Sequence, residues 1–327
     1  MEEVAIIANP QEKGYDFAKG IYDYISKKSE RNFSVGMGNI NRIEFKDKEY
    51  KIKIEKNIRR KKCIFIHDSN TEPARWFTDL AFTLEAIKYS SPFEITAVLP
   101  YTRFARQERK DESRVSVNAK AVANIISTYA DRGITCDLHA PQMQEYFSIP
   151  FDNLYTFPVL INHLKKNHKE SLENLVVVSP DTGGAKRVEA FQKKLAKEGI
   201  KTDLAIGYKK REKENEVGKI DIMGEVNNMN CLIIDDLIDT GGTLVKTAEV
   251  LRKKGARKVM AYGTHGLFSS GTEHLTGFDC LMTSNTLQAP DNKDIQIVSL
   301  TKLFGEAIYR TIVGKSLSNL FEEYKED

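Results

Sequence analysis

The stretch from Cys231 to Thr243 places the strongest limit on the fold. It reads Cys-Leu-Ile-Ile-Asp-Asp-Leu-Ile-Asp-Thr-Gly-Gly-Thr. The apolar run at its start predicts a buried parallel strand, and Leu244, Ala248 and Leu251 recur at helical spacing. The stretch therefore predicts a strand, an acidic turn and a helix, which is the repeating unit of an α/β sheet.

The turn itself predicts a ligand site. We expect Asp235 and Asp236 where the strand ends, and residues 239–243 in the loop that opens the helix. Glycines let a backbone fold around a ligand with its N–H groups inward, and a helix start adds roughly half a positive charge. A phosphate fits such a loop, while the carboxylates suit sugar hydroxyls or a metal. Neither Gly-x-x-x-x-Gly-Lys-Ser/Thr nor Gly-x-Gly-x-x-Gly occurs at this site, which excludes two common phosphate loops.

The same alternation of strand and helix patterns recurs along all 327 residues. It predicts an α/β protein with two doubly wound domains, each built on a mostly parallel sheet. Pro150 and Pro158 interrupt the pattern around Tyr155, so we place the boundary there, between an N-terminal domain 1–155 and a C-terminal domain 156–327. The pattern alone does not decide whether the halves arose by duplication.

Several elements matter for function. Alternating apolar residues from Ile43 to Ile54 predict a hairpin with Asp47-Lys48-Glu49 at its tip or in a bend. A short strand from Ile134 to Leu138 delivers Asp137 and His139 at its carboxyl end. The last helix, Leu303 to Ile312, is assigned to the second domain.

Polar groups follow five predicted strands. Taken singly each is weak, since a charged run is typical of a solvated loop and a lone His or Asp usually has a structural hydrogen bond. In open α/β sheets, however, the carboxyl ends of the strands form the ligand side, so the five segments can converge. They are Arg106-Gln107, Asp137 with His139, Asp181, Lys209 with Arg211, and the loop 235–243.

Composition excludes several functional classes. A net charge of +3 is small for a 37.1 kDa chain, so no nucleic-acid partner is expected. The longest run without Asp, Glu, Lys or Arg, Val259 to Thr272, has 14 residues, too few to span a membrane. Because Met1-Glu2-Glu3 is opposite in charge to a signal peptide, we expect a cytoplasmic protein.

Taken together, the motifs resemble those of ribose-phosphate pyrophosphokinases, also called phosphoribosyl pyrophosphate synthetases. The resemblance covers nearly the whole chain, and only its last motif is shared with ordinary phosphoribosyltransferases. It implies that both domains have the fold of type I phosphoribosyltransferases. The matching motifs are Phe45-Lys46-Asp47-Lys48-Glu49, residues 104–110 (Phe-Ala-Arg-Gln-Glu-Arg-Lys), Asp137-Leu138-His139-Ala140, residues 179–187 (Ser-Pro-Asp-Thr-Gly-Gly-Ala-Lys-Arg) and residues 235–243.

The family resemblance also implies an activity. Such enzymes transfer the β,γ-diphosphoryl group of ATP to the C1 hydroxyl of ribose 5-phosphate, giving phosphoribosyl pyrophosphate and AMP. The reaction depends on Mg²⁺ and needs no protein nucleophile, because positioning and charge neutralisation supply the catalysis. The expected partners are ATP, ribose 5-phosphate and further copies of the chain, in a dimer at minimum and a hexamer by analogy, without membrane attachment.

For ATP, the resemblance implies that Phe45 stacks on the base and that Asp47 and Glu49 contact it from a neighbouring subunit. Arg106 and Gln107 would begin a catalytic loop that closes over ATP, with Arg106 acting in catalysis.

For the metal and the acceptor, the implied residues follow the other strands. His139 and Asp181 would hold Mg²⁺, with Asp137 nearby. Lys209 and Arg211 would stabilise the transition state. Ribose 5-phosphate would be bound by Arg211, Asp235, Asp236, Asp239, Thr240, Gly241, Gly242 and Thr243.

Two other functions stay open at this point. A salvage phosphoribosyltransferase would explain the loop 235–243 but would not require Asp137-Leu138-His139. A catalytically silent homologue that assembles with active subunits should have lost loop or metal residues, and Arg106, His139 and Asp181 are all present.

Overall fold

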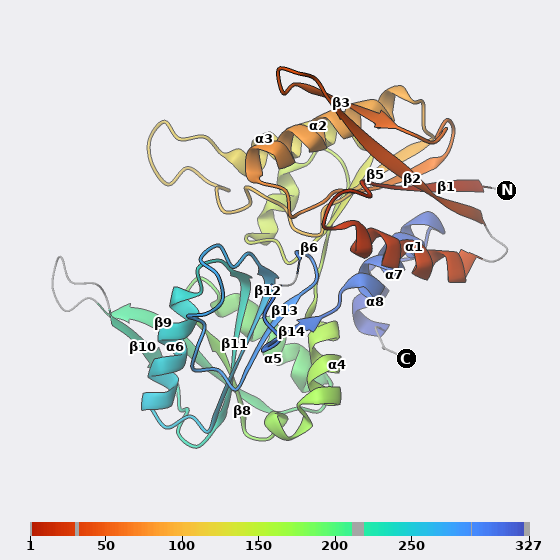
Figure 1. The fold of residues 1–327 in the computed structure, drawn as a ribbon. Helices are drawn as coiled ribbons and strands as arrows, with labels where there is room; N and C mark the ends of the chain where they lie inside the picture. Colours follow the sequence, from red (N-terminus) through yellow and green to blue (C-terminus); the bar gives the residue numbers. More distant parts are fainter. Residues whose placement is uncertain (1, 30–32, 211–218, 289, 324–327) are drawn as a thin grey trace. The chain divides into compact units, whose positions relative to one another are not determined.

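The computed structural model describes residues 2–29, 33–210, 219–288 and 290–323. The chain divides into two compact units between Tyr155 and Thr156. Unit 1 comprises the described residues up to Tyr155 together with Thr286–Gln288 and Leu300–Glu323. Unit 2 comprises those from Thr156 to Asn285 and 290–299. Each unit is an α/β body with its own sheet (Figure 1).

The described residues of unit 1 form a seven-stranded sheet in the order β3-β2-β1-β4-β5-β6-β7. The strands pair in parallel except for the antiparallel hairpin of β2 and β3. Near-continuous apolar strands such as Cys63–Ile66 are buried on both faces, as a parallel sheet requires. The strands are β1 Glu2–Ala8, β2 Phe33–Glu44, β3 Tyr50–Ile54, β4 Lys62–Ile66, β5 Glu94–Val98, β6 Arg132–Cys136 and β7 Phe151–Leu154.

Helices cover this sheet with apolar faces at helical spacing. In α2, Trp76, Leu80, Leu84 and Ile87 recur at helical spacing and are all fully buried, so they form the core face of this helix. The helix α7, blue in Figure 1, lies beside α1, and Phe17 meets Phe304 edge to face at 5.3 Å between ring centroids. The helices are α1 Tyr15–Ser29, α2 Pro73–Tyr89, α3 Asn118–Tyr129, α7 Thr301–Ile312, α8 Ser318–Glu323 and the 3-10 turn Pro141–Tyr146.

Unit 2 repeats the plan. Its sheet, within the described residues, has the order β10-β9-β8-β11-β12-β13-β14, and only β10 pairs antiparallel. Its strands are β8 Leu175–Ser179, β9 Thr202–Lys210, β10 Lys219–Met223, β11 Asn230–Ile238, β12 Lys258–Gly266, β13 Cys280–Ser284 and β14 Ile295–Val298. Its helices are α4 Phe157–Asn167, α5 Ala185–Lys197, α6 Gly242–Lys253 and the 3-10 turn Lys169–Leu172.

The two sheets have the same strand order, because the number of each strand in unit 2 is that of its counterpart in unit 1 plus seven. In each sheet the order reverses once, between β1 and β4 in unit 1 and between β8 and β11 in unit 2. Ligands of open α/β sheets bind outside the carboxyl ends of strands at such a reversal. In unit 2 that position lies between Ser179 and the end of β11.

The predicted α/β class with two doubly wound, mostly parallel sheets is confirmed. Three details differ from the sequence prediction. The strand β7 lies between Pro150 and Tyr155, where the sequence pattern predicts an interruption at the domain boundary. The strand β11 does not end at Asp235 and Asp236 but continues to Ile238. The helix α7 belongs to unit 1 rather than to a continuous C-terminal domain, because its apolar face packs on α1.

No helix in the described part of the chain could cross a membrane. The longest, α2, has 17 residues, and its exposed face carries charged side chains.

Candidate functional site

The loop that opens α6 has the geometry of a phosphate cradle. Gly241, the residue that caps the helix, has φ of 73°, in the left-handed region that favours glycine. A Cβ at this position would lie 2.2 Å from Leu275 Cδ2. The first turn of a helix leaves N–H groups without intrahelical partners, and its dipole favours an anion. Residues 239–243 therefore offer the site that the sequence predicts for a 5-phosphate.

The segment from Ser269 to Leu275 contacts this loop and holds it in place. Ser269 Oγ donates a hydrogen bond to Asp239 Oδ1, and His274 Nε2 donates to the backbone carbonyl of Thr240 at 2.6 Å. Leu275 packs against Gly241. These bracing residues were not found from sequence, because they lie some 30 positions after the loop and carry no motif of their own.

Asp181 lies in the turn between β8 and α5. It is exposed, and its Oδ1 accepts a hydrogen bond from the backbone N–H of Gly184 at 3.0 Å. Ser179 Oγ donates to the carbonyl of Asp181 at 2.6 Å, and a Cβ on Gly184 would lie 2.6 Å from that same Oγ. The turn is thus held by its own side chains, with the Asp181 carboxylate at its surface.

The carboxylates of β11 meet an arginine. Arg187 Nη1 lies 3.1 Å from Asp235 Oδ1, and Nη2 lies 2.7 Å from Asp236 Oδ1. Burial, and then the Asp236 carboxylate beside it, raise the pKa of Asp235 well above its ordinary value, while the Arg187 guanidinium lowers it. The guanidinium therefore offsets part of the electrostatic cost of holding two adjacent acids at the strand end. Its role was not assigned from sequence, although it ends the motif 179–187.

In unit 1, Asp137 and His139 follow β6 directly. Asp137 has φ of 38°, a strained conformation for a residue with a side chain. Its N–H donates to Leu154 O at 3.0 Å, and the N–H of Leu138 donates to Asn153 Oδ1 at 3.1 Å. The strand β7 thus fixes this turn, which buries the side chain of Asp137 and leaves His139 exposed.

Arg106 and Gln107 lie in the long segment between β5 and α3. The base of the segment is tied down by Thr102 Oγ1, which lies 2.9 Å from Thr135 Oγ1 in β6. Gln107 Nε2 donates to the Arg109 carbonyl at 3.0 Å and to Asp111 Oδ1 at 3.2 Å. The side chain of Arg106 is exposed. The segment presents cations beyond the carboxyl end of β5, as the sequence predicts.

The hairpin of β2 and β3 has the predicted tip. Phe45 N–H donates to the Glu49 carbonyl at 2.7 Å, and Lys48 adopts φ of 75° to close the turn. Phe45 is 49% exposed, unusually so for a phenylalanine, and Asp47 and Glu49 are exposed beside it. An aromatic ring and two carboxylates are therefore displayed together, away from the core of unit 1.

Lys209 lies in β9, where it pairs with Ile220 of β10. Arg211, predicted to act in catalysis and in ribose 5-phosphate binding, lies outside the described residues. Lys209 therefore lies on the strand beside the switch-point strand β8, and only its backbone is described.

The metal prediction fits the chemistry of its residues. Carboxylate oxygens are hard ligands of the kind that Mg²⁺ prefers, and the exposed His139 imidazole adds a nitrogen donor. Within the described residues no three His, Cys, Asp or Glu side chains form a ready metal cluster. Because Mg²⁺ sites often use one or two carboxylates plus water and substrate phosphates, the Mg²⁺ site stays a prediction. His139 and Asp137 belong to unit 1, and Asp181 belongs to unit 2.

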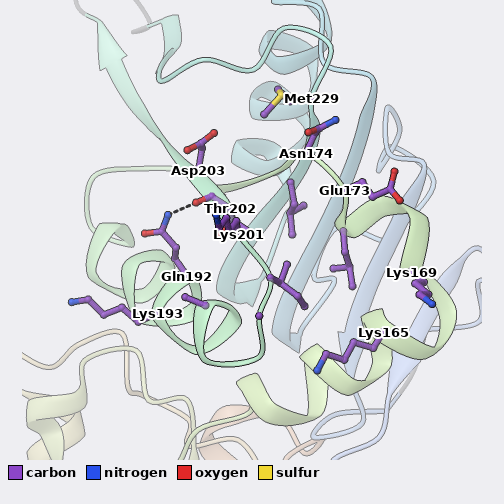
Figure 2. Close-up of a pocket in the computed structure, with 15 residues that line it drawn as sticks. Lys165, Lys169, Glu173, Asn174, Gln192, Lys193, Lys201, Thr202, Asp203 and Met229 are labelled. Carbon is purple, nitrogen blue, oxygen red and sulfur yellow. Dashed lines mark hydrogen bonds between the residues drawn. The ribbon is translucent and has the colours of Figure 1, made fainter.

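A large pocket of about 1300 Å³ lies at the other end of the unit 2 strands (Figure 2). Leu175 and Thr202, at the amino ends of β8 and β9, line it, and none of the predicted site residues does. Two of its four lysines form ion pairs, Lys165 with Glu198 and Lys193 with Glu189, and Glu173 and Asp203 also line it. The candidate site is therefore the carboxyl end of the sheet and not this pocket.

Protein-family models match most of the chain. Residues 12–129 match the model described as the N-terminal domain of ribose phosphate pyrophosphokinase. Residues 199–322 match the model of the phosphoribosyl synthetase-associated domain.

Known proteins agree with these models. A ribose-phosphate pyrophosphokinase of Rhizobium meliloti is 39% identical over 301 residues, 89% of this chain and 94% of that protein. One of Haemophilus ducreyi is 37% identical over 315 residues, 94% of this chain and 98% of that protein. The crystal structure of phosphoribosylpyrophosphate synthetase from Mycobacterium smegmatis covers 96% of this chain and 100% of its own, with a TM-score of 0.83 at 24% identity. That structure has the same fold.

Proposed function

The chain belongs to the ribose-phosphate pyrophosphokinase family, enzymes that make phosphoribosyl pyrophosphate, and we propose that it does so by Mg²⁺-dependent transfer of the β,γ-diphosphoryl group of ATP to ribose 5-phosphate. The acceptor is the C1 hydroxyl of the sugar, and AMP is the second product.

One observation carries the acceptor assignment. At the switch point of unit 2, paired carboxylates on β11 stand directly before a glycine loop that opens a helix. This combination matches a sugar phosphate, whose hydroxyls donate to carboxylates and whose phosphate accepts from backbone N–H groups. Asp235, Asp236 and Asp239 would hold the ribose, and residues 240–243 the phosphate.

The donor assignment rests on unit 1. The exposed Phe45 ring offers a surface on which an adenine stacks, and Asp47 and Glu49 beside it offer acceptors for the base N–H groups. Arg106 and Gln107 supply cation and amide donors for the phosphates. Because the hairpin tip extends away from the core of its own unit, we propose that it serves the ATP site of a neighbouring subunit.

The proposed chemistry is a direct displacement at the β-phosphorus, so no protein nucleophile takes part. The protein's contribution is to hold the C1 hydroxyl in line with the bond that breaks and to stabilise negative charge as it moves onto the transferred group. Lys209, Arg211 and Arg106 would provide that stabilisation. Mg²⁺ would neutralise phosphate charge, with His139 and Asp137 as the ligands proposed in unit 1 and Asp181 as the ligand proposed in unit 2.

We propose further that the enzyme is a homo-oligomer, a dimer at minimum, and that it acts in the cytoplasm, where ATP and ribose 5-phosphate are available. Sedimentation would test the assembly. An active monomer would contradict the role of Asp47 and Glu49 across subunits.

The decisive experiment measures the nucleotide product. Purified protein with ATP, ribose 5-phosphate and Mg²⁺ should form AMP and phosphoribosyl pyrophosphate in equal amounts. Release of ADP would point to ordinary phosphoryl transfer, and absence of any product would favour a silent homologue. Consumption of phosphoribosyl pyrophosphate with a free base would instead indicate a salvage phosphoribosyltransferase.

A further inference from the structure

Arg187 connects the two elements that flank the switch point of unit 2. It is the third residue of α5, the helix that follows β8, and it reaches the carboxyl half of β11. β8 and β11 are direct neighbours, with Val178 paired to Ile233. The side chain therefore crosses the position at which an α/β sheet of this kind holds its ligand.

We propose that Arg187 is a positioning residue that sets the recognition of the sugar diol, acting through the carboxylates of Asp235 and Asp236. The inference rests on the proposed function, since those carboxylates are assigned to the ribose hydroxyls.

The geometry separates this contact from an ordinary surface ion pair. The two terminal nitrogens of Arg187 serve different carboxylates, at 3.1 Å to Asp235 Oδ1 and 2.7 Å to Asp236 Oδ1. The Asp235 oxygen also accepts the N–H of Asp236 at 2.9 Å. The side chain of Asp236 is only 6% exposed, and that of Arg187 20%. A planar guanidinium can hold two acids at a fixed separation in this way, whereas a lysine ammonium offers a single point of charge.

The Arg187 cation also affects the capacity of the two acids to accept hydrogen bonds. Two adjacent carboxyls in a partly buried site repel each other, and burial together with this repulsion raises the pKa of Asp235, while the Arg187 guanidinium lowers it. A protonated carboxyl has lost acceptor capacity and has gained an O–H donor. Arg187 opposes that loss of acceptor capacity, and its two contacts fix the direction of one oxygen of each carboxyl.

This arrangement has a consequence for specificity. A site built to accept hydrogen bonds from a substrate hydroxyl discriminates strongly against the analogue without it, because buried acceptors are then left unpaired. With Arg187 in place, the site should prefer ribose 5-phosphate to 2-deoxyribose 5-phosphate. Loss of the arginine should reduce that preference, because the acceptors are no longer held in place.

The alternative is that Arg187 only stabilises the fold by pairing with a buried acid. A structural role lowers the fraction of folded enzyme, which changes the rates with both sugars equally. The ratio of the two kcat/KM values is independent of the folded fraction, so it separates the two roles.

The test compares Arg187→Met and Arg187→Lys with the wild type, using AMP formation at fixed saturating ATP and Mg²⁺ with each sugar phosphate. Arg187→Met should lower the ribose to deoxyribose ratio of kcat/KM by about tenfold or more, and Arg187→Lys should restore part of it. Arg252→Met is the matched control, since Arg252 pairs with Asp279 in the same unit without touching the candidate site. Its ratio should equal that of the wild type.

If Arg187→Met folds poorly, the double variant Arg187→Met/Asp236→Asn removes the buried charge together with its partner. It should recover thermal stability, and its ratio should fall at least as far as that of Arg187→Met, because Asp236→Asn also removes a carboxylate assigned to the ribose hydroxyls. An unchanged ratio in either folded variant overturns the proposal. If the wild type forms no AMP with ribose 5-phosphate, the proposed function fails instead, and the two failures are thereby distinguished.

Discussion

Gly241 and Leu275 are in contact at the mouth of the candidate phosphate loop, and the contact leaves no room for a side chain. The Gly241 backbone has φ of 73°, and a Cβ there would lie 2.2 Å from Leu275 Cδ2. Gly241→Ala should therefore both strain the backbone and displace the loop. We expect about 1–3 kcal/mol of lost stability and at least about a tenfold rise in KM for ribose 5-phosphate, measured by thermal unfolding and AMP formation.

A matched control exists at Gly199, which has φ of 77° and no atom within 4 Å of an added Cβ. Gly199→Ala carries the same backbone strain without the collision, so it should cost roughly 1 kcal/mol and leave the KM for ribose 5-phosphate unchanged. Adding Leu275→Ala to the Gly241 variant should relieve the collision and lower the KM again. If Gly241→Ala and Gly199→Ala change the KM for ribose 5-phosphate equally, the collision with Leu275 has no effect on substrate binding.

The fold and most site positions could be predicted because they depend on local patterns. Apolar strands followed by polar turns identify the carboxyl ends of a parallel sheet, and the glycine loop identifies a helix start. The strand β7 was missed because four residues flanked by Pro150 and Tyr155 are too short for a pattern. It is nevertheless what holds Asp137 and Leu138 in place.

Arg187 and α7 show a different limit. The importance of Arg187 comes from contacts with residues 48 and 49 positions later, and pairing over such distances is invisible to a pattern of a few residues. The helix α7 has a clear amphipathic pattern, but the pattern does not say that α1 is its partner. Local sequence predicts elements and ligand loops, while long-range packing decides which elements share a core and which side chains brace a site.

We predict that Phe45 contributes to ATP binding and contributes little to the stability of the fold. Because half of its surface is exposed, Phe45→Ala should change thermal stability little. Loss of aromatic stacking costs about 1–3 kcal/mol per base, so KM for ATP should rise roughly tenfold while KM for ribose 5-phosphate stays constant. Phe93→Ala is the control, since Phe93 is 72% exposed in the same unit and outside the hairpin. An identical KM for ATP in both variants would exclude the stacking role.

His67 should make the stability of unit 1 depend on pH. It is buried directly after β4, and its Nε2 lies 2.9 Å from the Trp76 carbonyl, so Nε2 carries a proton and donates it. Burial lowers the pKa of His67 from 6.5 to about 4. The unfolded chain therefore binds a proton first as pH falls. Stability from this group is complete above about pH 6.5 and is lost progressively toward about pH 4.

At about pH 5 the loss should amount to roughly 2 kcal/mol. His67→Gln keeps an N–H donor but does not titrate, so denaturant unfolding of this variant should change less between about pH 7 and about pH 5 than that of the wild type. Parallel losses in the two proteins would assign the pH dependence to other groups.

Asn153 offers a test of whether β7 supports the metal residues. Its Oδ1 accepts the N–H of Leu138, between Asp137 and His139, and the side chain is only 6% exposed. Asn153→Ala leaves that buried N–H without its acceptor, which costs about 1–3 kcal/mol and loosens the strained turn at Asp137. The Mg²⁺ concentration for half-maximal activity should therefore rise several-fold. Ser127→Ala also removes a side-chain acceptor of a backbone N–H, that of Ser148 at 3.1 Å, but this bond is exposed and does not involve residues 137–139. It should leave the Mg²⁺ requirement unchanged. A shift of equal size in both variants would contradict a specific role of β7 in metal binding.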